Sequence, residues 1–416
     1  MGLSDGESSL IKRAGSYHKT RKDLHAGFFW LDYIEMSDVV HDTWWVNKRD
    51  LLLRMAKEHG DAYVYDLATI ESAAHSMLAL NSVSRVLYAM KANSQPDVLR
   101  TLSAAGTDFD CVSPGEVDRL RHELPDQGKD RILFTPNFAP RKEYAWGVNE
   151  GLRITLDNLY PLQKWPELFA GQPLFVRLDP DHGAGHHEHV VTAGKASKFG
   201  ISLNEIDELK HLVADCGASI VGIHAHSGSG ILDPVNWQAV AETLVEVAHH
   251  FPDVSVLDLG GGIGVADKRT DSAFDLQALD QLLGKFKAAN SEFELWLEPG
   301  RFLVAQAGVL LTRVTQLKQK GGVHYVGVST GMNALIRPAL YDAYHEIVNL
   351  SKLDDELTET LNIVGPICET GDQLGTDRAM PPCEEGDIIL IANVGAYGHV
   401  MSSRYNLRDV PQEITI

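Results

Sequence analysis

A regular alternation of short apolar runs and longer amphipathic stretches fills the middle of the chain, and it constrains the fold more than any other feature. Eight runs have the length and composition of strands, and they cover residues 86–90, 107–112, 131–135, 152–156, 173–178, 220–226, 254–259 and 294–298. Stretches with helical spacing lie between them, for example 96–105, 114–122, 204–214, 237–250 and 276–289. Strands that alternate with helices form parallel βαβ units, and eight such units predict a (β/α)8 TIM barrel within an α/β protein.

The pattern changes toward the C-terminus. Apolar runs such as 309–311, 324–328 and 388–394 are bounded by glycine and proline rather than by long helices, which is typical of antiparallel strands. We therefore predict three parts. Residues 1–65 form a leader plus an N-terminal segment that contributes to a β domain, residues 66–307 form the barrel, and residues 308–416 form a second, mostly antiparallel β domain.

Charge and cysteine content exclude several classes of protein. The 37 lysines and arginines against 57 acidic residues give a net charge of −20, which disfavours binding to nucleic acids or anionic membranes. No apolar run is long enough to span a bilayer, and the first residues lack the apolar core of a signal peptide. The four cysteines show no CxxC pair, and we expect Cys111, Cys216 and Cys383 to serve packing. The sequence predicts a soluble, cytoplasmic protein.

In a TIM barrel the reactive groups stand at the carboxyl ends of the strands, so the residue that follows each run is informative. Lys91 follows the apolar run that ends at Met90. Loss of water around an ammonium group lowers its pKa, which would free the Lys91 amine to form a Schiff base. The competing interpretation is a surface lysine that merely ends a strand.

A pair of histidines ends the sixth run. His224 and His226 share one face of a strand, and the small-residue loop Ser227–Gly230 follows them. The pair could be metal ligands, a ring-stacking histidine with an anion-binding loop, or two packed core residues. We place metal lowest and predict none, because no third ligand stands at metal spacing.

Two further signals end the seventh and eighth runs. Consecutive glycines at 260–262 let backbone N–H groups approach a phosphate, although a tight turn would need them too. Val265 breaks the dinucleotide fingerprint, and no Gly-Lys-Ser/Thr follows. Glu298 could hold a proton on a heterocyclic nitrogen, and Arg301 could meet a phosphate or carboxylate; a surface turn is the alternative. Pyridoxal 5′-phosphate requires an amine for a Schiff base, a flat side-chain ring, a loop that binds phosphate and an acid for its ring nitrogen. The four signals together supply this set.

Seven motifs carry a family resemblance. They lie at residues 88–93 (YAMKAN), 198–200 (KFG), 226–230 (HSGSG), 260–262 (GGG), 298–301 (EPGR), 368–372 (CETGD) and 395–398 (GAYG). Over roughly residues 60–410, the sequence resembles the fold-type III pyridoxal-phosphate decarboxylases and, within them, the diaminopimelate decarboxylase family. The resemblance implies an alanine-racemase-like barrel. Segments 134–139 and 182–189 resemble the decarboxylase half of bifunctional aspartate kinase–diaminopimelate decarboxylases, which implies a fused or linked kinase domain.

The resemblance also implies residue roles. The cofactor would be bound by Lys91, His226, Ser229, Gly260, Gly261, Gly262, Glu298, Gly300, Arg301 and Tyr397. The amino-acid substrate would be bound by Arg301, Arg337, Tyr341, Glu369 and Tyr397. The catalytic residues would be Lys91, His226, Glu298 and Cys368. Cys368 and Glu369 would reach across from a second subunit, which implies a homodimer with shared active sites.

The implied reaction is decarboxylation of meso-2,6-diaminopimelate to L-lysine and CO2, the last step of lysine biosynthesis. A decarboxylase of D-ornithine or D-lysine type is the nearest alternative, and an amino-acid racemase or a non-catalytic regulatory homologue is more distant. The cluster of histidines at 186, 187 and 189 resembles a metal site, but we interpret it as a polar loop between barrel units.

Overall fold

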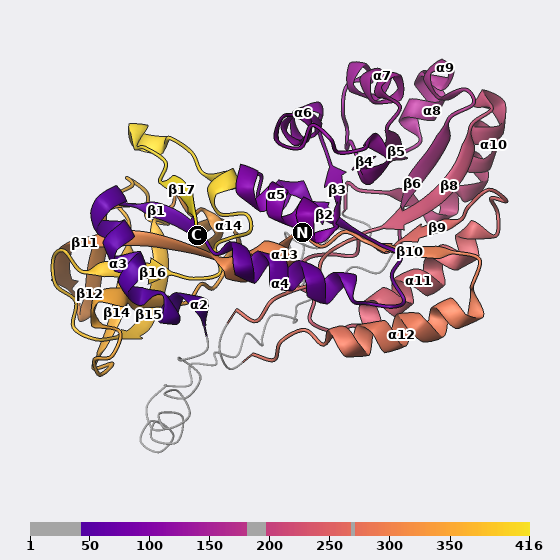
Figure 1. The fold of residues 1–416 in the computed structure, drawn as a ribbon. Coiled ribbons are helices and arrows are strands. Elements are labelled where there is room, and N and C mark those ends of the chain that lie inside the picture. The colour runs from indigo at the N-terminus through magenta and orange to yellow at the C-terminus, as the bar shows by residue number, and fades with distance from the viewer. Residues whose placement is uncertain (1–42, 181–196, 268–270) are drawn as a thin grey trace, which may run out of the picture.

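The computed structural model describes residues 43–180, 197–267 and 271–416. The chain forms two lobes, each built around one sheet (Figure 1). The leader expected over the first 30 or so residues and the histidines at 186–189 lie outside the described residues.

One lobe is a closed barrel of eight parallel strands. The strands are β2 (Arg85–Ala89), β3 (Asp108–Cys111), β4 (Ile132–Phe134), β5 (Arg153–Leu156), β6 (Pro173–Asp179), β8 (Ser219–Ala225), β9 (Val256–Asp258) and β10 (Glu294–Leu297). They pair in the order β5-β4-β3-β2-β10-β9-β8-β6, and a β5–β6 pairing closes the ring, with the short β7 (Ile201–Ser202) added beside β6. The predicted fold class, a TIM barrel with a second β domain, is confirmed.

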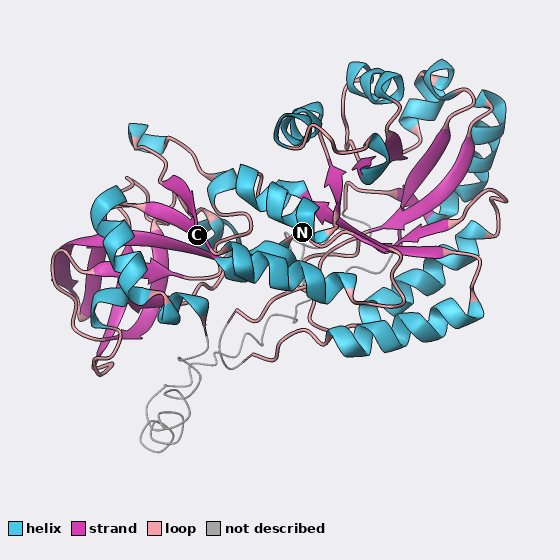
Figure 2. Ribbon diagram, in the orientation of Figure 1, coloured by secondary structure: helices cyan, strands magenta, loops and turns pink. Residues whose placement is uncertain are grey.

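Helices cover the barrel strands on the outside (Figure 2). They are α4 (Leu67–Leu78), α5 (Pro96–Ala105), α6 (Pro114–Glu123), α7 (Arg141–Glu150), α8 (Tyr160–Lys164), α9 (Pro166–Phe169), α10 (Ile206–Cys216), α11 (Val235–Ala248), α12 (Leu276–Ala289) and α13 (Arg301–Val304). Helix α4 precedes the first barrel strand, and the others follow strands along the chain. Local signals explain where they begin: α5 and α6 start with proline, and the side chains of Gln95 and Ser113 cap them. The apolar stripe of α12 buries Leu279, Leu283 and Phe286.

The second lobe holds a mixed, mostly antiparallel sheet. Its strands are β1 (Ala62–Tyr65), β11 (Gly308–Lys320), β12 (Val323–Val328), β13 (Ile347–Asn349), β14 (Glu359–Val364), β15 (Gln373–Met380), β16 (Ile388–Ile391) and β17 (Gln412–Thr415). The long β11 pairs with β1, β12 and β16, whereas β1–β17 and β12–β14 are parallel. Helices α2 (Trp44–Asn47), α3 (Arg49–His59) and α14 (Arg337–Tyr341) complete this lobe. The domain limits 1–65, 66–307 and 308–416 stay predictions.

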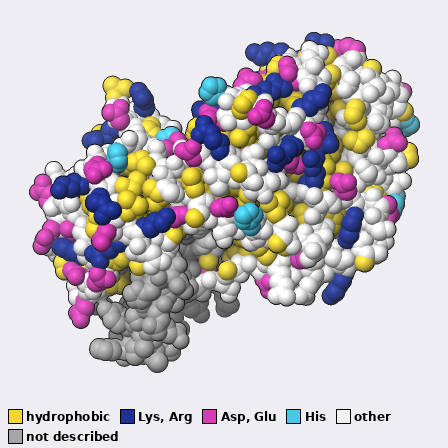
Figure 3. Space-filling model, in the orientation of Figure 1, with side chains coloured by type: hydrophobic (Ala, Val, Ile, Leu, Met, Phe, Trp, Pro, Cys, Tyr) yellow, Lys and Arg dark blue, Asp and Glu magenta, His cyan; other side chains and the backbone are white. Residues whose placement is uncertain are grey.

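The surface and the helix lengths add two observations. Acidic and basic side chains are interspersed over both lobes on the face shown in Figure 3. Among the described residues, no helix is both long enough and apolar enough to cross a membrane.

Six of the eight predicted strands extend one residue too far. The runs 86–90, 107–112, 131–135, 220–226, 254–259 and 294–298 each end one residue beyond the observed strands, which are β2, β3, β4, β8, β9 and β10 respectively. The last ladder hydrogen bond depends on the neighbouring strand, so composition along the chain cannot mark the end to within a residue. Lys91, His226 and Glu298 therefore stand on the backbone that leaves the barrel.

Candidate active site

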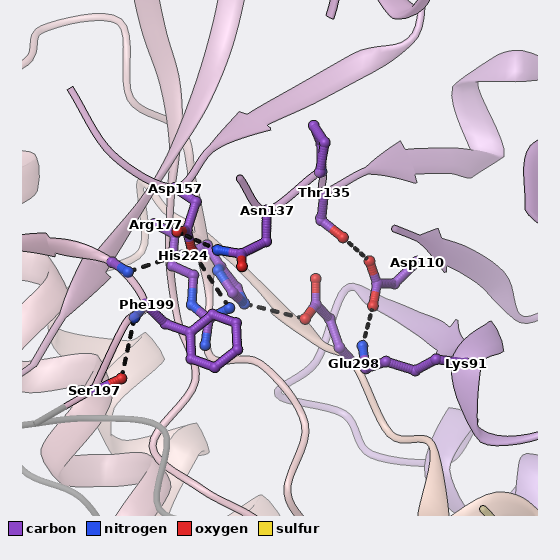
Figure 4. A network of polar contacts seen from close by, with 12 residues as sticks. Lys91, Asp110, Thr135, Asn137, Asp157, Arg177, Ser197, Phe199, His224 and Glu298 are labelled. Atoms are coloured by element: carbon purple, nitrogen blue, oxygen red, sulfur yellow. Dashed lines mark hydrogen bonds and ion pairs between the residues drawn. The ribbon is translucent and has the colours of Figure 1, made fainter. Parts of the chain in front are cut away.

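Lys91 lies at the carboxyl end of β2, in the short 3-10 helix Met90–Ala92. Its Nζ is 2.8 Å from Oδ2 of Asp110, which lies on the neighbouring strand β3 in register with Ala89. The hydroxyl of Thr135 donates to the other oxygen of Asp110. Figure 4 shows these side chains converging with Glu298. A carboxylate thus fixes the direction of the lysine amine.

The expected lowering of the Lys91 pKa is wrong. Burial by itself would lower the pKa of the ammonium group, but Asp110, Tyr397 and Glu298 oppose it and raise the pKa of Lys91 above its ordinary value. The Lys91 side chain is also 43% exposed, so it faces an open mouth rather than a dry pocket. Sequence reasoning missed the Asp110 partner because the pairing depends on register between two strands.

Glu298 follows β10 and is 6% exposed. Its Oε2 is 3.1 Å from Nε2 of His224, and because a carboxylate only accepts, this nitrogen donates. Burial would raise the pKa of Glu298, but the charge and hydrogen bond of His224, together with Lys91, lower it to about 2. The other oxygen, Oε1, has no hydrogen-bond partner within the described chain. Glu298 is thus an ionised carboxylate with one buried oxygen available to a donor.

His226 and the glycine turn pack against one another. The backbone N–H of Gly261 donates to Nδ1 of His226 over 3.2 Å. A Cβ at Gly260, Gly261 or Gly262 would lie 2.4 Å, 2.1 Å and 2.3 Å from the carbonyl oxygens of Ala225, Glu298 and Gly228 respectively. Burial, with Arg177 and Lys91 nearby, holds the pKa of His226 well below its ordinary value, so its ring is neutral. The contact distances show that both adjoining loops approach too closely for any side chain there.

A polar cluster joins the barrel to the β lobe. Nη2 of Arg301 donates to Oγ of Ser229 over 3.1 Å, and the guanidinium lies 5.2 Å from the ring centre of Tyr397. Tyr397 comes from the β lobe, and its backbone N–H donates to the carbonyl of Ala92. A Cβ at Gly300 would lie 3.3 Å from the Tyr397 hydroxyl. A cation and a hydroxyl therefore stand beside the glycine turn, as a bound phosphate requires.

Arg337 opens helix α14 and is 4% exposed. Burial and the nearby Arg301 guanidinium lower the pKa of Arg337 to about 10, whereas Asp267, Tyr397 and Tyr341 favour its charged form. Arg337 thus stays cationic at neutral pH. Two guanidiniums that influence each other at one mouth favour an anionic ligand between them.

Cys368 and Glu369 lie in the loop between β14 and β15, and both are exposed. The Tyr405 hydroxyl donates to the Glu369 carboxylate, and Oδ1 of Asn406 accepts from the Cys368 backbone N–H. These two hydrogen bonds tie the loop to the C-terminal segment of the same chain. Exposed side chains of this kind are what a site shared between subunits would present.

Sequence reasoning missed a buried polar group beside this site. Arg177 on β6 is 3.6 Å from Asp157, which directly follows β5, and its guanidinium lies 4.4 Å from the ring centre of Phe199. The amide of Asn137 donates to Asp157, as Figure 4 shows. The signal in the sequence was Arg177, a charged residue inside an otherwise apolar strand. Charged residues are almost never fully buried unless they are paired, so a buried partner could have been expected.

The expectation that no third ligand accompanies the histidine pair is wrong for His224. Ligand atoms of His224, Asp258 and Glu298 lie within 4.8 Å of one another, and all three residues are buried. Asp258 ends β9 and Glu298 follows β10, so spacing along the chain could not reveal them. The absence of a metal stays a prediction.

These residues fit pyridoxal phosphate. Glu298 offers a buried, unpartnered carboxylate oxygen for a ring nitrogen, and Ser229 with Arg301 stands beside the glycine turn. A family model for the pyridoxal-binding domain of pyridoxal-dependent decarboxylases matches residues 67–305. The chain belongs to this class of enzymes, whose cofactor is pyridoxal phosphate.

Relatives narrow the class further. Diaminopimelate decarboxylase of Methanothermobacter thermautotrophicus is 38% identical over 344 residues, which cover 80% of each chain. The Escherichia coli enzyme of that name is 33% identical and covers 87% of this chain and 90% of its own. A crystal structure of diaminopimelate decarboxylase matches with a TM-score of 0.81 at 31% identity, covering 88% of this chain and 91% of that one. The chain belongs to the diaminopimelate decarboxylase family.

Proposed function

We propose that this chain decarboxylates meso-diaminopimelate to L-lysine and CO2 at the barrel mouth. One observation carries the proposal. Lys91 and the ionised Glu298 lie at the same barrel mouth, where the charge of Glu298 raises the pKa of Lys91, and the Ser229–Arg301 pair lies beside them. A diaminopimelate decarboxylase structure from Helicobacter pylori, complexed with L-lysine, supports the product (TM-score 0.77, 28% identity, 86% of this chain and 91% of that one). The reaction would take place in the cytoplasm, and a linked aspartate kinase stays a prediction.

The bound cofactor supplies an electron sink for the carbon that loses CO2. Glu298 would accept a hydrogen bond from the protonated ring nitrogen and so keep that nitrogen cationic. His226, being neutral, would stack on the ring without adding charge. Ser229, Arg301 and the N–H groups of the glycine turn would hold the phosphate, and Gly300 leaves room for Tyr397.

Lys91 holds the cofactor until substrate arrives, and Asp110 keeps its amine directed toward the mouth. Because the pKa of Lys91 is raised, the amine must give up a proton before it reacts, and the Asp110 carboxylate is hydrogen-bonded to it. Lys91 and Cys368 are the two groups that can return a proton to the substrate Cα.

Substrate selection would depend on the distal end of the substrate. Arg337 binds the distal carboxylate, while Arg301, Tyr341 and Tyr397 contribute to carboxylate binding. Glu369 of a second subunit meets the distal ammonium. A substrate that lacks the distal carboxylate leaves a buried guanidinium unpaired, which is costly.

A substrate panel tests the proposal. The purified chain with pyridoxal phosphate is incubated with meso-diaminopimelate, D-ornithine or D-lysine, and CO2 and the amine product are measured. We expect rapid CO2 release and L-lysine from meso-diaminopimelate, with much slower release from the other two. A preference for D-ornithine or D-lysine would favour the alternative decarboxylase, and no CO2 release from any substrate would contradict both.

The shared site makes a prediction about mixed dimers. Lys91→Ala and Glu369→Ala chains are each inactive in this account, but in a mixed dimer one site receives an intact Lys91 and an intact Glu369. Random association of equal amounts then restores about a quarter of wild-type activity, since half of the dimers are mixed and one of their two sites is complete. A mixture no more active than the separate variants would show that each site is built from one chain.

A further inference from the structure

Three titratable side chains meet behind the candidate cofactor site, where β8, β9 and β10 lie side by side. His224 on β8 is in register with Asp258 on β9, and Asp258 is in register with Trp296 on β10. Glu298 follows Trp296 by two residues, and in an extended chain residues i and i+2 point to the same side. The topology therefore brings two carboxylates and one imidazole to a single level of the barrel, although they are far apart in sequence.

Each of these side chains is buried and retains one polar atom without a partner among the described residues. Asp258 is 0% exposed, His224 3% and Glu298 6%. The atoms concerned are Nδ1 of His224, Oδ2 of Asp258 and Oε1 of Glu298. Oδ1 of Asp258 is already used, because it accepts the backbone N–H of Gly260 over 3.0 Å. The orphan oxygen of Asp258 is therefore the part of this residue that needs an explanation.

Two ionised carboxylates cannot share such a place without a high cost, because both are buried and each repels the other. Glu298 receives the hydrogen of His224 Nε2, whereas the donor that the described residues supply to Asp258 is the backbone N–H of Gly260. Burial and the Glu298 charge hold the pKa of Asp258 well above its ordinary value, while His224 lowers that of Glu298. The pair therefore holds one proton, and the surroundings place it on Asp258.

We propose that Asp258 is a positioning residue that keeps a proton and donates it in a hydrogen bond to Glu298, so that the ionised Glu298 carboxylate is held toward the cofactor nitrogen. Together with His224, Asp258 gives Glu298 two donors from the protein. These leave lone pairs on Glu298 free to accept from the ring nitrogen. This inference rests on the proposed function only for what Glu298 then does to the cofactor.

Asparagine and alanine at position 258 separate this role from a general packing role. Asparagine can accept from Gly260 with its oxygen and donate an N–H where the acid donates an O–H. We expect Asp258→Asn to stay within about threefold of wild type in cofactor dissociation constant and kcat, because the donor is kept. Asp258→Ala should weaken both on the order of tenfold to a hundredfold, which is what loss of one hydrogen bond to a charged group costs.

A readout on the full-length holoenzyme tests the proton directly. An infrared difference spectrum between wild type and Asp258→Asn should show loss of one carboxylic-acid carbonyl band that shifts in D2O. Asp108→Asn is the matched control: Asp108 is a buried aspartate on β3, but it pairs with Arg85 and Arg131, so it is ionised and its loss should remove no such band.

Two results would overturn the proposal: an Asp258→Asn variant as impaired as Asp258→Ala, or an infrared spectrum with no carboxylic-acid band lost. Either would mean that Asp258 works as an ionised carboxylate. The infrared measurement does not need decarboxylation, so failure of the proposed function would appear separately, as a wild-type protein that releases no CO2.

Discussion

Replacing Lys91 by alanine should abolish CO2 release from meso-diaminopimelate and leave the purified protein without the visible absorbance of its cofactor. The account gives this amine two tasks, covalent attachment of the cofactor and proton transfer at Cα. Loss of both should lower kcat on the order of a thousandfold or more. Absorbance spectra of the variant after removal of unbound pyridoxal phosphate, and CO2 release with pyridoxal phosphate added, measure the effect.

Lys210→Ala is the control for that experiment. Lys210 is a partly exposed lysine on α10 that, among the described residues, pairs with Asp207 one turn away, and such surface pairs contribute little. Its absorbance and activity should equal those of wild type. A Lys91→Ala protein that keeps both the absorbance and substantial turnover would show that another amine carries the cofactor.

Replacing Arg337 by alanine should remove most of the preference for meso-diaminopimelate. The guanidinium is 4% exposed and stays charged at neutral pH, so a carboxylate bound to it is desolvated and paired. Its loss should lower kcat/KM for meso-diaminopimelate on the order of a hundredfold. The slow turnover of D-lysine, which has no distal carboxylate, should change little.

Arg337→Lys distinguishes charge from geometry. Lysine keeps the positive charge but cannot form the two parallel hydrogen bonds of a guanidinium, so its kcat/KM should fall between those of wild type and alanine. Thermal melting of both variants checks that the fold is retained. An unchanged ratio of kcat/KM for meso-diaminopimelate over D-lysine in Arg337→Ala would remove Arg337 from the substrate site.

The barrel could be predicted from the sequence because its signal is local. Most strands are short apolar runs, and α5 and α12 begin and end at the predicted residues 96–105 and 276–289. The Lys91 and Glu298 positions could also be predicted, because the carboxyl ends of parallel strands meet at one mouth.

What could not be predicted depends on pairing between strands. Asp110 raises the pKa of Lys91 only because Ala89 and Asp110 are in register, and no periodicity along the chain encodes that register. The same holds for Asp258, which meets His224 across two strands. Sequence reasoning therefore placed Lys91 and Glu298 at the carboxyl ends of barrel strands but assigned the wrong direction to the pKa of Lys91.

Reduction of the holoenzyme with borohydride, followed by peptide mapping, tests most directly whether the cofactor is held by the lysine at the end of β2. Borohydride fixes a pyridoxyl group permanently on whichever amine carries it. We predict a single modified peptide that contains Lys91. A pyridoxyl group on any other lysine, or on none, would contradict the account.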